Sequence, residues 1–83
     1  MQVSVKKEVM SMPLSMISTG EQGIIHRISG KEDTKRFLSN LGFVEGSPVT
    51  VVSRVDGNII VRVLDSRIAI GKKMANKIMV ERN

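Results

Sequence analysis

Residues 37–52 of this 83-residue chain read FLSNLGFVEGSPVTVV, in which two glycines separate a leucine-rich run from a valine-rich run. The first run continues a helical pattern, with Phe37, Leu38 and Leu41 on one face. The second run begins at Pro48, where a missing N–H does least harm to a strand. The stretch therefore predicts a helix that ends, and a strand that begins, within a few residues.

The two glycines are interpreted as a structural joint. Gly42 fits the left-handed residue that follows a helix, with Phe43 packing back on Leu38. Gly46 fits the third position of a type II turn over Val44–Ser47, which also needs a positive φ. A phosphate-binding loop is excluded here, because such loops precede a helix and a helix C-terminus carries a negative partial charge.

The helix is predicted over residues 29–42. Ser29 and Glu32 have the spacing of a capping box, with Asp33 as an alternative cap. The two phenylalanines of the chain, Phe37 and Phe43, are both predicted to lie in the core.

The rest of the chain is typical of short strands. They are predicted at 22–28, 48–55, 58–64, 66–70 and 77–81, with a short apolar turn in 13–17 and a helical turn in 71–76. Asp56-Gly57 is a strong signal for a tight hairpin. In the first strand, Ile24, Ile25 and Ile28 cannot all face one side, which indicates either a bulge or burial on both faces.

These elements predict a mainly β fold with one short inserted α-helix and a small barrel of about five strands. Closure into a barrel would remove the exposed sheet edges. The length favours one domain, at residues 12–83, preceded by an N-terminal tail at residues 1–11. No apolar run approaches the ~20 residues of a membrane span, no signal peptide begins the chain, and the chain has no Cys, which fits a cytosolic protein that does not insert into membranes.

The charge pattern says little about partners by itself. The net charge is +5, but no block of five like charges occurs, so solvated faces are favoured over a nucleic-acid footprint. With two Phe, no Tyr and no Trp, stacking of single-stranded bases is not expected.

Side chains for catalysis are scarce, so we do not expect an enzyme. The single histidine, His26, is the only candidate metal ligand of its kind and would need carboxylates from elsewhere. Thioether ligands are the alternative reading of the methionines, although packing is the commoner role. The methionines in question are Met10, Met12, Met16, Met74 and Met79.

In this order and spacing, the motifs MPLSM (12–16), TGEQG (19–23), FLSNLGFVEGSPVTVV (37–52) and DSRIAIGKKMANKIMV (65–80) resemble the FeoA family of bacterial ferrous-iron uptake. The resemblance implies an SH3-like barrel and no catalytic activity or cofactor. It also implies a cytosolic accessory role, by docking on the GTPase domain of the FeoB membrane transporter. Whether this chain itself binds ferrous iron stays open.

The same barrel ends the iron-dependent repressors, so a nucleic-acid-binding or regulatory barrel is the alternative. The commonest family form has Pro at position 45, where this chain has Glu, and a longer loop in place of Asp56-Gly57. The candidate partner contacts are three cationic or turn segments: Lys35 and Arg36 in the helix, Asp56 and Gly57 in the hairpin, and Lys72 and Lys73 in the second helical turn.

Overall fold

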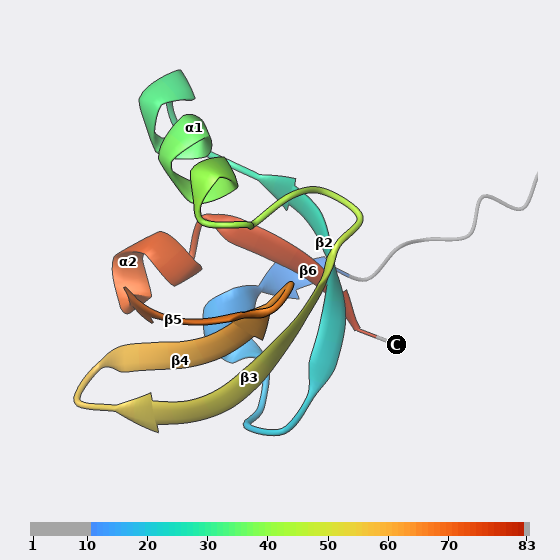
Figure 1. The fold of residues 1–83 in the computed structure, drawn as a ribbon, viewed down its shortest axis with the longest axis vertical. Coiled ribbons are helices and arrows are strands. Elements are labelled where there is room, and N and C mark those ends of the chain that lie inside the picture. Colours follow the sequence, from blue (N-terminus) through green and yellow to red (C-terminus); the bar gives the residue numbers. More distant parts are fainter. Residues whose placement is uncertain (1–10, 83) are drawn as a thin grey trace, which may run out of the picture.

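The computed structural model describes residues 11–82 and arranges six strands in one antiparallel sheet with the order β1-β6-β2-β3-β4-β5 (Figure 1). The elements along the chain are β1 (Ser11–Pro13), the 3-10 helix η1 (Leu14–Met16), β2 (Gln22–Ile28), α1 (Glu32–Asn40), β3 (Pro48–Val55), β4 (Asn58–Val63), β5 (Ser66–Gly71), α2 (Lys72–Ala75) and β6 (Ile78–Arg82). Most of the expected tail, residues 1–10, lies outside the described residues. No helix within residues 11–82 is long and apolar enough to cross a bilayer.

The expected fold class is confirmed, with one strand more than predicted. Strand β1 has only three residues and pairs with β6 through Met12 opposite Val80. Three residues that include a proline carry no strand signal, so only the pairing with β6 reveals this strand. The sheet curls around a core of buried aliphatic side chains and one ring, that of Phe43. The core comprises Leu14, Ile17, Ile25, Leu38, Phe43, Val49, Val51, Ile59, Val61, Val63, Ile70, Ala75, Ile78 and Val80.

The expected closure of the sheet is wrong for the part of the chain that the structure describes. Strands β1 and β5 each have a single neighbour, so the sheet keeps two edges. The segment between β5 and β6 forms α2, whose Ala75 is fully buried. A helical turn therefore covers this side of the core in place of a strand pair.

The joint at residues 42–47 is confirmed in detail. The N–H of Phe43 donates to the Leu38 carbonyl at 3.0 Å, and the N–H of Gly42 donates to the Ser39 carbonyl at 3.0 Å. This is the Schellman pattern, with Gly42 at φ +111. The N–H of Ser47 donates to the Val44 carbonyl at 3.0 Å, with Gly46 at φ +91, as a type II turn requires.

The start of α1 differs from the prediction. Lys31 is the N-cap and no side chain caps the helix, so the capping box at Ser29 and the alternative cap at Asp33 are both wrong. Instead, the hydroxyl and the N–H of Ser29 both donate to the Lys77 carbonyl, at 3.3 and 2.8 Å. The Ser29 hydroxyl therefore bonds to a residue 48 positions away in the sequence and does not cap the helix.

Phe37 is not a core residue, because its side chain is 51% exposed. Helix α1 lies at one end of the sheet (Figure 1) and buries fully only Leu38, with Leu41 packed at the edge of the core. Phe37, the residue before Leu38, therefore points its ring away from the sheet.

The bulge in β2 is confirmed, with the pairing to β6 shifting between Ile25 and Arg27. The hairpin at Asp56-Gly57 is also confirmed, with both residues at positive φ. Strand β4, however, ends at Val63 and not at Leu64. Leu64 begins a second two-residue turn and has φ +55. Leucine is not a typical turn residue, so this turn was not predicted.

Candidate functional site

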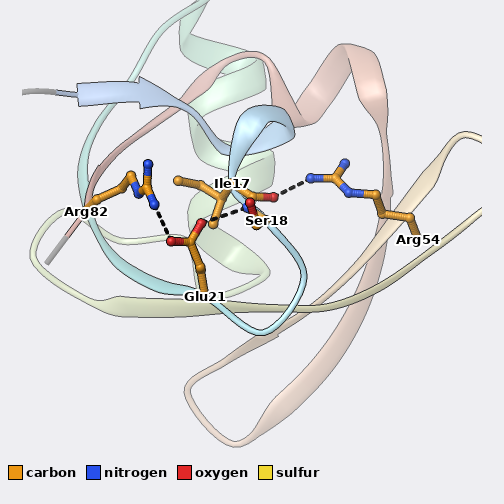
Figure 2. Close-up of polar contacts among 5 residues, drawn as sticks. All are labelled: Ile17, Ser18, Glu21, Arg54 and Arg82. Carbon is orange, nitrogen blue, oxygen red and sulfur yellow. Dashed lines mark hydrogen bonds and ion pairs between the residues drawn. The ribbon is translucent and has the colours of Figure 1, made fainter.

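The loop between η1 and β2 is fixed by a carboxylate (Figure 2). Glu21 accepts a hydrogen bond from the N–H of Ser18 at 3.0 Å and forms an ion pair with Arg82. The Ser18 N–H and the Arg82 guanidinium hold the pKa of the Glu21 carboxyl below its ordinary value. The Gly20 N–H also donates to the Val51 carbonyl at 2.7 Å, so the loop is tied to β3 as well.

Arg54 reaches this loop from the other side. Its guanidinium donates from β3 to the carbonyl of Ile17, as Figure 2 shows. A guanidinium has five N–H donors, and this bond uses one of them. The bond therefore orients Arg54 while most of its donors stay available.

Arg54 lines a groove of about 260 Å³ between η1, the β3–β4 hairpin and α2. The lining residues are Ser15, Arg54, Gly57, Asn58, Ile59 and Lys72. Ile59 is the only buried aliphatic among them, whereas Arg54 and Lys72 are cations and the Asn58 amide carries hydrogen-bond donors. The Ser15 hydroxyl already donates to the Oδ1 of Asn76. Since no carboxylate lines this basic groove, the arrangement favours an anionic ligand group.

The basic groove contains two of the predicted contact residues, Gly57 and Lys72. Asp56 lies beside it in the hairpin turn, and Lys73 follows Lys72 as an exposed residue of α2. Sequence reasoning missed Arg54, Ser15 and Asn58, because no local pattern shows that these separate segments meet.

The other predicted pair, Lys35 and Arg36, lies on α1, at the opposite end of the molecule from the β3–β4 turn (Figure 1). Lys35 forms an ion pair with Glu32 at 3.9 Å. It also lines a second groove, of about 320 Å³, with Ile28, Ser39, Phe43, Val44 and Glu45. The six predicted contact residues therefore do not form one surface.

His26 has one acidic partner. Its Nδ1 lies 3.1 Å from the Oε2 of Glu81, and both side chains are partly exposed. Within residues 11–82, no three or more His, Asp or Glu side chains are grouped to hold a metal ion. Of the methionines considered as thioether ligands or packing residues, Met12 and Met74 pack against the core and Met16 is exposed. Met10 lies outside the described residues.

Comparison with known proteins places this chain among iron-transport sequences. The profile of the FeoA domain matches residues 12–82. A putative Fe(2+) transport protein A of Methanocaldococcus jannaschii is 35% identical over 69 residues, which cover 83% of this chain and 84% of that protein. A fusion of Fe(2+) transport protein A with the Fe(2+) transporter FeoB, from Porphyromonas gingivalis, is 32% identical over 72 residues, 84% of this chain and 8% of the fusion.

Solved structures show the same fold. A crystal structure described as an iron uptake regulatory protein (FeoA) superposes with a TM-score of 0.82 and 33% identity, over 90% of this chain and all of that one. A manganese-dependent transcriptional repressor superposes with a TM-score of 0.83 over 92% of this chain and 44% of that chain. At 23% identity, the second likeness extends to the fold alone.

Proposed function

The chain belongs to the FeoA family, and from this premise we propose that it is a non-enzymatic cytoplasmic accessory protein that binds the GTPase domain of a FeoB-type ferrous-iron transporter. The observation that carries the proposal is the relative from Porphyromonas gingivalis, in which the matching domain and a FeoB transporter share one polypeptide. Domains joined in one chain in one organism often associate as separate chains in another, because the linker only raises their effective concentration.

The contact surface in this proposal is the basic groove, extended by Asp56 and Lys73 at its rim. The groove supplies two cations and the Asn58 amide around a buried aliphatic floor. Interfaces combine an apolar centre with a polar rim in this way. Lys35 and Arg36, the other pair expected from the sequence, lie on α1 at the far end of the molecule and form no part of this surface.

Ferrous iron enters the proposal as the cargo of the pathway. His26 and Glu81 supply two ligands, and a stable site for a transition metal needs at least one more from the protein. We therefore assign no resident iron site to residues 11–82.

The test is association of the full chain with the isolated cytosolic domain of the FeoB-type transporter from the same genome, measured by calorimetry. We expect binding that Lys72→Gln weakens. Lys35→Gln is the matched control, because it removes one positive charge far from the basic groove. Absence of any association at high micromolar concentrations would contradict the proposal.

A second arm of the same test addresses nucleic acid. A protein that neutralises several phosphates loses affinity steeply as salt rises. Binding of the full chain to duplex DNA with such a salt dependence, in place of binding to the transporter domain, would favour the regulatory alternative suggested by the repressor fold.

A further inference from the structure

Strand β5 lies at an edge of the sheet, and its turn fixes which backbone groups face outward. Val63 and Ser66 flank a two-residue turn and are register partners, so they form a hydrogen-bonded pair. Such pairs alternate with non-hydrogen-bonded ones along an antiparallel ladder. Arg67 and Ala69 are thus non-hydrogen-bonded toward β4 and turn their N–H and C=O groups to the open edge.

Among residues 11–82, no strand lies beside these outward groups. In the region the structure describes, β4 is the only strand that pairs with β5, and no further backbone hydrogen bond involves residues 66–70. Arg67 and Ala69 are both exposed. A row of unpaired N–H and C=O groups is a template for another strand.

The side chains at this edge carry an unbalanced charge. Arg62 on β4 and Arg67 on β5 are direct register partners, and both are exposed. Like charges placed opposite each other on neighbouring strands are destabilising. None of the ion pairs among residues 11–82 includes either arginine, although Asp65 is only two residues from Arg67. The pair is therefore suited to an acidic group supplied from outside.

Leu64 adds an apolar contact at the end of the strand. It is 60% exposed and has φ +55, a conformation that costs a leucine free energy. A Cβ placed on Gly42 would lie 3.3 Å from the Leu64 Cδ1, so the glycine of the joint makes room for this side chain. An exposed leucine in a costly conformation has no evident use in the core.

From these observations we infer that the open edge of β5 receives an extended acidic segment of a protein partner, which adds as a further strand. Backbone hydrogen bonds at Arg67 and Ala69 would supply affinity, as in other strand additions. Arg62 and Arg67 would hold carboxylates of the incoming strand, since the guanidinium fork matches a carboxylate. The inference deepens the proposed function, on which it rests for the partner being a protein.

Two other occupants fit the edge less well. A second copy of this chain carries the same net charge of +5 and would bring its own Arg67 to the edge, so like charges would oppose the pairing. An anionic bilayer would attract the arginines but would repel Asp65, which lies next to Leu64 at the tip of the hairpin.

The test uses the full chain and a synthetic eight-residue peptide of alternating Val and Glu, with the Val–Lys peptide as the matched control. Backbone amide shifts and hydrogen exchange are followed by NMR. We expect the acidic peptide to shift β5 and to protect the Arg67 and Ala69 amides, whereas the basic peptide does neither. The double variant Arg62→Gln, Arg67→Gln should bind about tenfold more weakly, as expected for the loss of two charge-assisted contacts.

A backbone variant separates strand addition from simple charge attraction. Ala69→Pro removes one outward N–H without removing a bond to β4, and proline is tolerated at such edge positions. It should abolish protection at β5, while Ala69→Val, which keeps the N–H, should not. If Ala69→Pro fails to fold, protection of the Arg67 and Ala69 amides in the unaltered chain still separates the two, because charge attraction alone leaves these amides exchanging freely.

Several outcomes would overturn the inference: equal binding of both peptides, or shifts centred on Arg54 and Lys72. So would protection of the β5 amides that grows with protein concentration in the absence of peptide, or β5 shifts caused by phosphatidylglycerol vesicles and not by the peptide. The transporter measurement can fail while the peptide binds, and the peptide can fail while the transporter binds at the basic groove. The two proposals are therefore contradicted by different results.

Discussion

The β3–β4 and β4–β5 hairpins both turn through two residues, but only the first has residues that suit a positive φ. The first turns at Asp56-Gly57, where both positive φ angles suit the residues that adopt them. The second turns at Leu64-Asp65 and places a leucine at φ +55. The first lies beside a groove of about 260 Å³, whereas the second ends at an open sheet edge with two opposed arginines. The residues of the first turn are the ones that its fold requires, whereas those of the second are not, so the second hairpin is where we infer a further binding role in addition to the basic groove.

The largest effect on stability is expected when Gly42, which makes room for Leu64 of the second hairpin, is replaced. Gly42→Ala should destabilise the fold by about 1–3 kcal/mol, because alanine is strained at φ +111 and its Cβ would lie 3.3 Å from Leu64. Gly57→Ala is the matched control in the first hairpin, where φ is +80 and no atom lies within 4 Å of the added Cβ. Thermal unfolding of both variants measures the difference. Equal losses would show that the Leu64 contact contributes nothing.

The turn within the joint offers a smaller effect of opposite sign. Glu45 occupies the second position of the type II turn, where proline has a suitable φ. Glu45→Pro should raise the free energy of unfolding by about 0.4–1 kcal/mol by restricting the unfolded chain. Chemical denaturation of this variant, with Glu45→Ala as the control for the lost charge, gives the answer. A lower stability in the proline variant would contradict the turn assignment.

Replacement of Leu64 tests whether its conformation is kept for binding. Leu64→Gly removes a left-handed cost of about 1–2 kcal/mol and adds a glycine entropy cost of about 0.5–1 kcal/mol. The net result should be a gain of about 0.5 kcal/mol in stability, together with weaker binding of the Val–Glu peptide. A clear loss of stability with unchanged peptide binding would make Leu64 a structural contact. The second turn would then serve folding, as the first does.

The smallest effect concerns pH and the end of the molecule near the first hairpin. Glu21 has a lowered folded pKa, so the stability that it contributes is present above its ordinary pKa and is lost as pH falls toward the folded value. Glu21→Gln should therefore flatten the acid limb of the stability curve in this range. Arg54 orientation should loosen in parallel, because the Glu21 loop carries the Ile17 carbonyl that it binds. An unchanged acid limb would show that the Glu21 contacts do not persist in solution.

Elements with local sequence signals were predicted correctly, and the turn at Leu64, which has none, was not. Alternation and turn residues predicted the strands at 22–28 and 48–55 with their observed bounds, and the glycine spacing predicted the joint. Local signals sufficed there, since turn types demand particular residues. Leu64 carries no such signal, because the pairing of β4 with β5 imposes the turn on it.

Contacts distant in sequence account for the remaining differences. Ser29 was expected to cap α1, but the Lys77 carbonyl accepts its hydroxyl. Gly57 and Lys72 were candidate contacts for separate reasons, and only the folded chain brings them to one groove with Arg54. The open edge at β5 could not be predicted for the same reason. The segment after β5 forms α2 and does not close the sheet, and this depends on how the whole core packs.

In the proposed function, this chain acts by binding a transporter domain through protein contacts. Titration of the isotope-labelled full chain with the cytosolic domain of its FeoB-type transporter, followed by amide NMR, tests it most directly. We expect saturable shifts at the basic groove around Arg54, Asn58 and Lys72 and along β5 at Arg67 and Ala69, with α1 unaffected. A spectrum that does not change at high micromolar concentrations, or shifts confined to α1, would contradict it.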